Sequence, residues 1–172
     1  MTRIILLGGY GGFGGRIARR LASAGYEVLV AGRSIEKARD FCAKSPGLMP
    51  LALDRSGITA ALKEHEPDLV VDASGPFKAM DHAIPKACIA AGVHYVDIAD
   101  SRDFVCGIRV LDEAARAGPA VSAAIVGQVG QPMRIWRGQR WAKAFGWQEL
   151  RSVSFGCGVR GDKQDENAHC LA

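Results

Sequence analysis

Long apolar runs, closely spaced cysteines and the motifs of several enzyme classes are all missing from this sequence. No stretch reaches the ~18 consecutive apolar residues that a membrane-spanning helix needs, so we expect no membrane span. Neither a P-loop lysine nor a serine, histidine and aspartate in triad order is present, which removes support for a kinase or a hydrolase. The cysteines form no C-x-x-C pair, which argues against a metal site and a disulfide framework; they are Cys42, Cys88, Cys106, Cys157 and Cys170.

A secretion signal is also missing. The apolar run at residues 4–7 is too short for a signal peptide and leads directly into glycines. Widely spaced cysteines fit a reducing compartment, so the sequence predicts a cytoplasmic location. With 172 residues, of which 48% are hydrophobic and 23% charged, the chain has the composition of a globular protein and the length of one domain with a tail.

Glycine is abundant near the start of the chain. Residues 8–15 read Gly-Gly-Tyr-Gly-Gly-Phe-Gly-Gly. Gly9, Gly11 and Gly14 fit the G-x-G-x-x-G spacing of dinucleotide-binding loops, and Gly8, Gly11 and Gly14 fit a looser variant. Either pattern alone is a weak signal. Its value depends on a strand before it, a helix after it and a specificity residue about 20 positions further on.

The surrounding residues supply this context. Residues 3–7 predict a strand that is buried on both faces. Phe13, Ile17, Leu21 and Ala24 recur at helical spacing and predict the inner face of a helix that Gly25 ends. Residues 27–31 predict a second strand, which completes a βαβ unit. We therefore predict that a dinucleotide is bound by Gly9, Tyr10, Gly11, Gly12, Phe13 and Gly14.

The end of the second predicted strand indicates which dinucleotide is bound. An NAD site has a carboxylate here for the ribose hydroxyls, but residues 31–34 read Ala-Gly-Arg-Ser. Arg33 has a planar fork of donors that suits a phosphate, and Ser34 can add a hydroxyl and cap the next helix. An isolated arginine is more often a solvated turn residue. After this motif, however, Arg33 predicts the 2′-phosphate of NADP as its ligand.

The following residues continue to alternate between strand and helix patterns. Strands are predicted at residues 48–53, 68–72 and 94–98, and helices at 34–44, 58–64, 81–91 and 104–117. This alternation predicts an α/β fold with a doubly wound, Rossmann-like parallel sheet.

Residues after the third and fourth predicted strands are further candidates for the cofactor site. Asp54 follows the third strand, where the adenine often lies in such folds, although a surface aspartate is an equal alternative. Ser74, Gly75 and Pro76 follow the fourth strand, at the edge where open parallel sheets bind ligands. We expect them to contact the cofactor; the alternative is a turn that needs Gly75 and Pro76 for its geometry alone.

The sequence does not identify a catalytic residue. None of His65, His82, His94 and His169 has a persuasive position. His82 and His94 are expected nearest to the carboxyl edge of the sheet, with helix capping or partial burial as the alternatives. Asp97 and Asp100 lie at the carboxyl end of the fifth predicted strand, and we expect Asp97 to hold a loop rather than to perform chemistry.

Three segments make the chain similar to the NADP-binding domain of the saccharopine dehydrogenase-like proteins. They are the glycine-rich residues 8–14, the sequence Asp-Ala-Ser-Gly-Pro-Phe at 72–77, and Tyr-Val-Asp at 95–97 with Asp100 and the helix after it. The resemblance covers residues 1–117. It implies a cytoplasmic NADP(H)-binding domain of a reductase or dehydrogenase that acts on a carbon–nitrogen or carbonyl substrate. It also implies phosphate-binding roles for Gly9, Gly11 and Gly14.

The likeness ends near Gly118. Residues 119–126 predict a sixth strand, so we assign residues 1–126 to the cofactor domain and 127–172 to a short basic tail with three tryptophans. Family members continue into a substantial substrate and dimerisation domain, and we hypothesise that the tail is a truncated or frame-shifted remnant of it. The tail has a basic run at helical spacing, which favours an amphipathic helix with a solvated face over nucleic-acid binding; it comprises Arg134, Arg137, Arg140 and Lys143.

The sequence therefore predicts an NADP(H)-binding domain of an oxidoreductase, in which the cofactor supplies the hydride chemistry. The alternative is a non-catalytic NADP-binding or interaction module, because the substrate domain is missing. The small-molecule substrate is unknown, and the resemblance is compatible with a homo-oligomer.

Overall fold

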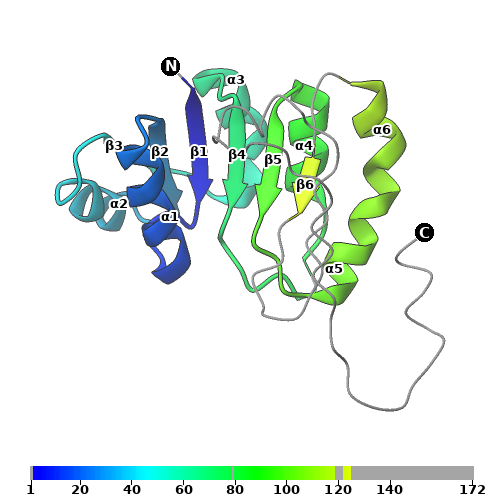
Figure 1. The fold of residues 1–172 in the computed structure, drawn as a ribbon, viewed down its shortest axis with the longest axis horizontal. Helices are drawn as coiled ribbons and strands as arrows, with labels where there is room; N and C mark the ends of the chain where they lie inside the picture. Colours follow the sequence, from blue (N-terminus) through cyan, green and yellow to red (C-terminus); the bar gives the residue numbers. More distant parts are fainter. Residues whose placement is uncertain (1, 79, 119–121, 125–172) are drawn as a thin grey trace, which may run out of the picture.

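Six parallel strands form one sheet in the computed structural model, which describes residues 2–78, 80–118 and 122–124. The strand order is β3-β2-β1-β4-β5-β6, so the predicted doubly wound sheet is confirmed (Figure 1). The strands are β1 (Arg3–Leu7), β2 (Glu27–Gly32), β3 (Leu48–Ala52), β4 (Leu69–Asp72), β5 (His94–Asp97) and β6 (Ser122–Ala124). The predicted tail at residues 127–172, with its basic run, His169, Cys157 and Cys170, lies outside the described residues.

The register of the sheet brings the carboxyl ends of its strands into one row. Leu7 pairs with Ala31 on one side and with Asp72 on the other. Asp72 pairs with Asp97, which pairs with Ala124. Because all the pairings are parallel, the loops after β1, β2 and β4 leave the sheet at the same edge.

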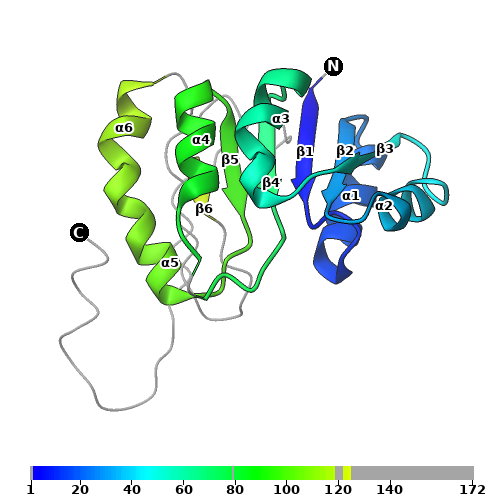
Figure 2. The same ribbon diagram turned by 180° about the vertical axis from the view of Figure 1, so that it is seen from behind.

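Helices cover both faces of the sheet (Figures 1 and 2). α1 (Gly12–Ser23) and α2 (Ile35–Cys42) pack on one face, and α3 (Ile58–His65) and α4 (Ala83–Ala91) on the other. A 3₁₀ turn, η1 (Arg55–Gly57), precedes α3. The single helix predicted at residues 104–117 is instead α5 (Arg102–Gly107), η2 (Ile108–Leu111) and α6 (Asp112–Ala117), so the chain tightens to a 3₁₀ turn directly after Gly107.

Alternate residues of each central strand enter different halves of the core. In β1, Ile4 and Leu6 pack beneath α1 and α2, whereas Ile5 and Leu7 pack beneath α3 and α4. β1 and β4 are therefore apolar at almost every position, as the sequence predicts for parallel strands buried on both faces. β3, which contains Pro50, lies at the sheet edge, where a missing N–H is tolerated.

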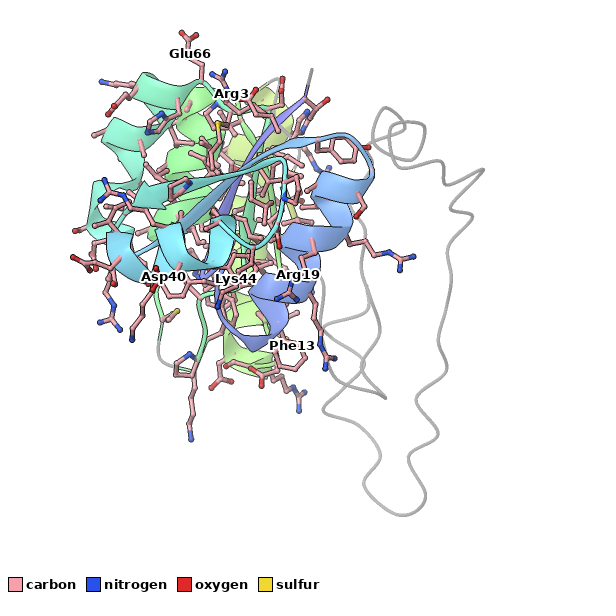
Figure 3. The ribbon with its side chains drawn as sticks, turned by 90° about the vertical axis from the view of Figure 1, so that its left-hand side faces the viewer. Arg3, Phe13, Arg19, Asp40, Lys44 and Glu66 are labelled. Carbon is pink, nitrogen blue, oxygen red and sulfur yellow. The ribbon has the colours of Figure 1, made fainter. Side chains whose placement is uncertain are left out.

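The predicted inner face of α1 is wrong at its first residue. Ile17 and Leu21 pack against the core, but the side chain of Phe13 is 70% exposed. The buried positions of the helix are Gly14, Gly15 and Ala18, which are small enough to bring the helix axis close to the sheet. Phe13 lies one residue before this face, at the end of the molecule opposite Arg3 and Glu66 (Figure 3).

The helix-end signals predicted at Ser34 and Gly25 are confirmed, and α4 has similar signals at Gly92 and Pro85. Ser34 caps α2 by accepting a hydrogen bond from the Lys37 amide. Gly25 and Gly92 follow α1 and α4 in the left-handed conformation, with φ of 84° and 70°. Pro85 lies in the first turn of α4, where its missing N–H needs no acceptor within the helix.

Two further observations concern the described part of the chain as a whole. It contains no helix that combines the length and the apolar character needed to cross a bilayer. Its three cysteines, Cys42, Cys88 and Cys106, are not in disulfide bonds.

Candidate cofactor site

The glycine loop between β1 and α1 is packed so tightly that side chains are excluded from three of its positions. A Cβ on Gly9 would lie 2.8 Å from the carbonyl oxygen of Leu6. Gly8 has a φ of 68°, and a Cβ there would lie 2.7 Å from the carbonyl oxygen of Ala73. A Cβ on Gly14 would overlap the carbonyl oxygen of Gly8. Gly8 therefore lets the loop approach the segment after β4, and Gly14 lets α1 approach the loop.

Two other glycines of the same loop have more room. A Cβ on Gly12 would meet no described atom within 4 Å, and one on Gly11 would meet only the Gly8 carbonyl oxygen, at 3.1 Å. Gly11 is the N-cap of α1 and provides no side-chain hydrogen bond, and the first turn contains no acidic residue. The backbone is thus accessible at the N-terminus of this 12-residue helix.

The first amides of α1 make this end of the helix a suitable anion site. The first-turn N–H groups of a helix have no acceptor within it, and here those of Gly12, Phe13 and Gly14 donate to no described carbonyl outside it. The helix dipole adds a partial positive charge. Together these properties fit a diphosphate that lies against the backbone.

Tyr10 points from the glycine loop toward the turn after β2. Its ring lies against the backbone of Gly32, where a Cβ would overlap the ring. Its hydroxyl accepts a hydrogen bond from the Ser34 amide, with a distance of 3.2 Å between nitrogen and oxygen. The structure therefore joins the predicted diphosphate loop to the predicted 2′-phosphate turn through one side chain.

Arg33 is exposed in this turn, and within the described residues no hydrogen bond or ion pair engages it. Its guanidinium can therefore accept a new anionic ligand. The Ser34 hydroxyl, in contrast, is occupied: it donates to Glu36 at 3.0 Å and accepts from the Lys37 amide at 3.3 Å. The helix cap predicted at Ser34 is confirmed, whereas its contact with a phosphate stays a prediction.

Asp54 has a structural task at the start of η1. Its carboxylate accepts hydrogen bonds from the amide and the hydroxyl of Ser56, at 3.1 and 2.9 Å. These bonds lower the pKa of Asp54, and the positive charges of Arg33 and Arg55 act in the same direction. The predicted contact between Asp54 and the adenine stays a prediction.

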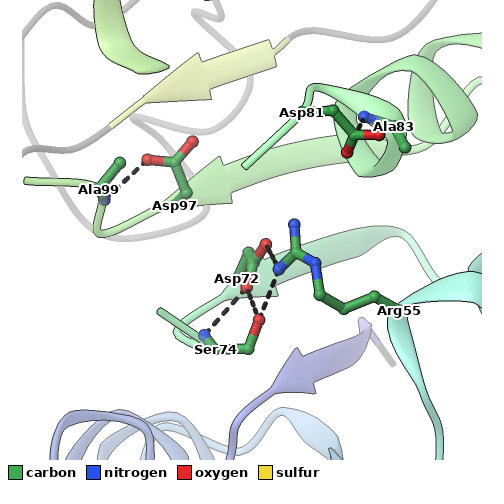
Figure 4. A network of polar contacts seen from close by, with 7 residues as sticks. All are labelled: Arg55, Asp72, Ser74, Asp81, Ala83, Asp97 and Ala99. Carbon is green, nitrogen blue, oxygen red and sulfur yellow. Dashed lines mark hydrogen bonds and ion pairs between the residues drawn. The ribbon is translucent and has the colours of Figure 1, made fainter. Parts of the chain in front are cut away.

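The segment after β4 contacts the glycine loop, and hydrogen bonds to Arg55 and Asp72 fix its position. A Cβ on Gly8 would lie 2.9 Å from the Cα of Ser74, so the two loops are in contact. Arg55 donates to Asp72 at 2.8 Å and to the Ser74 hydroxyl at 2.6 Å (Figure 4). Asp72 in turn accepts from the amide and the hydroxyl of Ser74, at 2.9 and 2.6 Å. Gly75 and Pro76 follow, exposed and joined by a cis peptide bond.

A second buried carboxylate lies beside this network. Asp97 pairs with Asp72 across the sheet and is fully buried, and its Oδ1 accepts a hydrogen bond from the Ala99 amide at 2.9 Å. The expected loop-holding role of Asp97 is therefore confirmed. Burial raises the pKa of Asp97 to about 7, and the nearby charge of Asp72 adds to this effect.

Three polar atoms in this region are buried without a hydrogen-bond partner among the described residues. They are Nη2 of Arg55, the hydroxyl of Tyr95 and Oδ2 of Asp97. Tyr95 and Asp97 point to the same face of β5 and influence each other's pKa, and burial holds the pKa of Tyr95 well above its usual range. A protonated Asp97 leaves one negative charge, on Asp72, to balance the charge of Arg55.

Neither of the two histidines considered for catalysis is placed for it. Nε2 of His82 lies 2.8 Å from the carbonyl oxygen of Phe104, so it must donate its proton there, and the ring stacks on Phe104 with centroids 4.5 Å apart. His94 is the first residue of β5 and so lies at the amino edge, not at the carboxyl edge as predicted. The position of His94 was wrong because the strand begins, rather than ends, at this residue.

Comparison with known families agrees with this arrangement. The sequence profile of the saccharopine dehydrogenase NADP-binding domain matches residues 4–127. The chain belongs to this family. The predicted resemblance is thus confirmed, and this domain of the family binds NADP. No curated protein matches the sequence.

Solved structures with the same fold are reductases and oxidoreductases of low sequence identity. A yeast methylglyoxal/isovaleraldehyde reductase in complex with NADPH shares 15% identity at a TM-score of 0.58, over 72% of this chain and 53% of that chain. A metagenomic short-chain oxidoreductase in complex with NADP shares 21% identity at a TM-score of 0.53, over 74% and 82%. Leucoanthocyanidin reductase from Vitis vinifera, also with NADPH, shares 18% identity at a TM-score of 0.51, over 72% and 47%. This chain thus spans about half the length of the yeast and grape proteins, and the likeness shows the fold.

The residues of this family member fit the cofactor that its domain binds. An open helix N-terminus can take the diphosphate, and the strand that precedes Arg33 ends in glycine rather than in a carboxylate. The sequence did not predict Arg55 and Tyr95 as part of the site's support. The Tyr-Val-Asp motif at residues 95–97 was the available signal for Tyr95, whereas Arg55 carries no signal that connects it with Asp72.

Proposed function

We propose that this NADP-binding domain holds NADP(H) across the loops after β1, β2 and β4 and presents it for hydride transfer to or from a carbon–nitrogen or carbonyl substrate. The observation that carries this proposal is the pairing of an open, uncapped α1 N-terminus with an unengaged Arg33 at the end of β2. The cofactor supplies the hydride; the chain's own residues bind and orient it.

Each predicted contact has a defined part in this proposal. The amides of Gly12, Phe13 and Gly14 donate to the diphosphate, and Gly9 and Gly14 keep the loop and helix close enough for this. Arg33 binds the 2′-phosphate with its planar donors. Ser74, Gly75 and Pro76 line the side of the site next to β4, where Arg55 and Asp72 fix the position of Ser74.

A second candidate function is a non-catalytic NADP-binding or interaction module. One observation favours it: among the described residues, His82, the histidine nearest to the carboxyl edge, already uses its Nε2 proton in a bond to Phe104. The first candidate is supported by two proteins of the same fold, which are described as complexes of reductases with NADPH.

Titration of the purified chain with NADPH and NADH, followed by nicotinamide fluorescence, tests the proposal. We expect saturable binding of both cofactors and tighter binding of NADPH. Absence of binding would refute the proposed function. Binding without oxidation of NADPH by any of a panel of imines and carbonyl compounds would favour the non-catalytic module.

Substitution of Arg33 tests the 2′-phosphate contact. We expect Arg33→Asp to weaken NADPH binding by about 10- to 100-fold, because a hydrogen-bonded charge contributes ~1.5–3 kcal/mol, and to leave NADH binding nearly unchanged. Arg39→Asp, on the exposed surface of α2, makes the same change in net charge and is the matched control. Equal NADPH affinities of the two variants would exclude the proposed role of Arg33.

Several further expectations stay predictions. They are the division of the chain into residues 1–126 and 127–172, the cytoplasmic location, the formation of a homo-oligomer, and the expectation that the chain does not bind nucleic acid.

A further inference from the structure

Tyr10 holds both chain neighbours of Arg33. On one side, the Tyr10 ring lies against Gly32 so closely that a Cβ there would stand 2.6 Å from Cζ of the ring. On the other side, the amide of Ser34 donates to the Tyr10 hydroxyl at 3.2 Å. The residue between them therefore has its backbone fixed relative to the glycine loop.

This fixation matters because little else engages the Arg33 side chain. It is exposed and makes no hydrogen bond or ion pair with the described residues. The position of the Arg33 backbone therefore determines which points its guanidinium can reach. The hydroxyl of Ser34, which could compensate, is committed to Glu36 and to the Lys37 amide.

The anchor itself is firmly placed. Tyr10 is half-buried and packs against the core cluster that includes Val30 and Ala18, beneath α1 and α2. Its backbone lies between Gly9, whose amide donates to the Ala31 carbonyl at 3.2 Å, and the α1 cap at Gly11. One end of Tyr10 is thus part of the diphosphate loop, and the other end is bonded to the turn that carries Arg33.

We propose that Tyr10 is a specificity-determining residue: it sets the spacing between the glycine loop and Arg33, so that one NADP molecule can reach the loop with its diphosphate and Arg33 with its 2′-phosphate. The proposal rests on the proposed function. It assigns Tyr10 a positioning role instead of the direct cofactor contact predicted from the motif.

Tyr10→Phe is the direct test, since it keeps the ring and removes the hydroxyl. We expect NADPH affinity to fall about three- to tenfold, the range of one hydrogen bond, with NADH affinity unchanged. Tyr26→Phe makes the same chemical change in the same core cluster, away from the turn, and should leave the ratio of the two affinities unchanged. Equal losses for NADPH and NADH in Tyr10→Phe would overturn the proposal.

A double-mutant cycle separates positioning from general stability. In an Arg33→Gln background, Tyr10→Phe should no longer change the NADPH-to-NADH ratio, because its effect acts through the guanidinium. A full additional loss of selectivity in that background would contradict the proposal.

Gly32→Ala is an independent second variant. Its methyl group would push the Tyr10 ring away from the turn, and we expect the same fall in selectivity with Ser34 and Arg33 intact. Unchanged selectivity would count against Tyr10. If the unsubstituted chain binds both cofactors equally, Arg33 has no 2′-phosphate role and the proposal fails with it; if selectivity depends on Arg33 but not on Tyr10, only the present inference fails.

Discussion

The glycine loop after β1 and the polar network after β4 touch each other at one edge of the sheet, yet they are built in opposite ways. The glycine loop has few side chains: Gly8 and Gly14 allow backbone to lie against backbone, and Gly12 faces open space. The network consists of side chains, with Arg55, Asp72 and Asp97 at its centre and both carboxylates fully buried. The shape of the glycine loop depends on the absence of side chains, whereas the polar network depends on the balance between its charged groups.

The contrast leads to different sensitivities. In the glycine loop, the effect of an added methyl group depends on whether backbone or solvent lies beside that position. In the network, removal of one partner leaves a charge without compensation in a region of low polarity. The loop should therefore respond to added volume, and the network to lost charge and to pH.

The largest effect is expected from Arg55→Met. This change leaves the buried Asp72 carboxylate without its cation, so we expect the free energy of unfolding to fall by about 3–5 kcal/mol. Chemical denaturation at neutral pH measures it. Arg3→Met is the control, because Arg3 pairs with Glu27 at 2.9 Å on a more exposed part of the surface. Arg3 also donates to the His65 carbonyl at 2.8 Å, so we expect this variant to lose less than about 2 kcal/mol. Similar losses in the two variants would contradict the charge-balance account of the network.

A pH effect of the next size is expected from Asp97. Its pKa in the folded chain is about 7 against an ordinary value of 3.8. Between these values the unfolded chain gives up this proton while the folded chain keeps it, so the contribution of Asp97 to stability is complete below about pH 4 and is lost as the pH rises through 7. The groups facing Asp97 are Asp72 of β4, Arg55 of η1 and Tyr95 of β5.

Asp97→Asn tests this expectation. Between pH 4 and pH 7 the free energy of unfolding of the unsubstituted chain should fall by roughly 2–4 kcal/mol, and the variant should not show this fall. Urea denaturation across this pH range measures both proteins. The asparagine keeps an oxygen for the Ala99 amide, so the loop itself is not disturbed. Parallel pH profiles of the two proteins would show that Asp97 ionises normally in the folded chain.

The smallest change in stability is expected within the glycine loop, where two similar substitutions should differ. Gly14→Ala places a methyl group against the Gly8 carbonyl, so we expect a loss of about 1–3 kcal/mol and loss of NADPH binding. Gly12→Ala meets no described atom and should leave the melting temperature unchanged, while NADPH binds more weakly because the methyl group enters the proposed space of the diphosphate. If Gly12→Ala keeps full NADPH affinity, the diphosphate does not lie against Gly12 and its proposed position is wrong.

The two regions also differ in how far the sequence predicts them. The glycine spacing, the strand before it and Arg33 after β2 follow from local patterns, because a tight strand-to-helix turn admits few residue types. The inner face of α1 was predicted wrongly at Phe13, since apolar spacing does not show that Gly14, Gly15 and Ala18 form the close contact.

The network could be predicted only in part. Asp72 and Asp97 are visible in the sequence as the ends of two strands, and the parallel order places them side by side. Their cation is 17 residues from Asp72, in a short 3₁₀ turn, and no periodicity connects the two. Whether a buried carboxylate is paired or protonated depends on the neighbours that the fold brings, which a local pattern does not contain.

The direction of β6 has a consequence for assembly. β6 runs parallel to β5, so Ala124 stands in the same row as Leu7, Asp72 and Asp97, at the edge of the proposed cofactor site. A partner unit fused after this strand would begin at that edge without a connection that crosses the sheet. Tethering at such a point holds a partner at an effective concentration of about millimolar, so even a weakly associating unit would be kept near the proposed cofactor site.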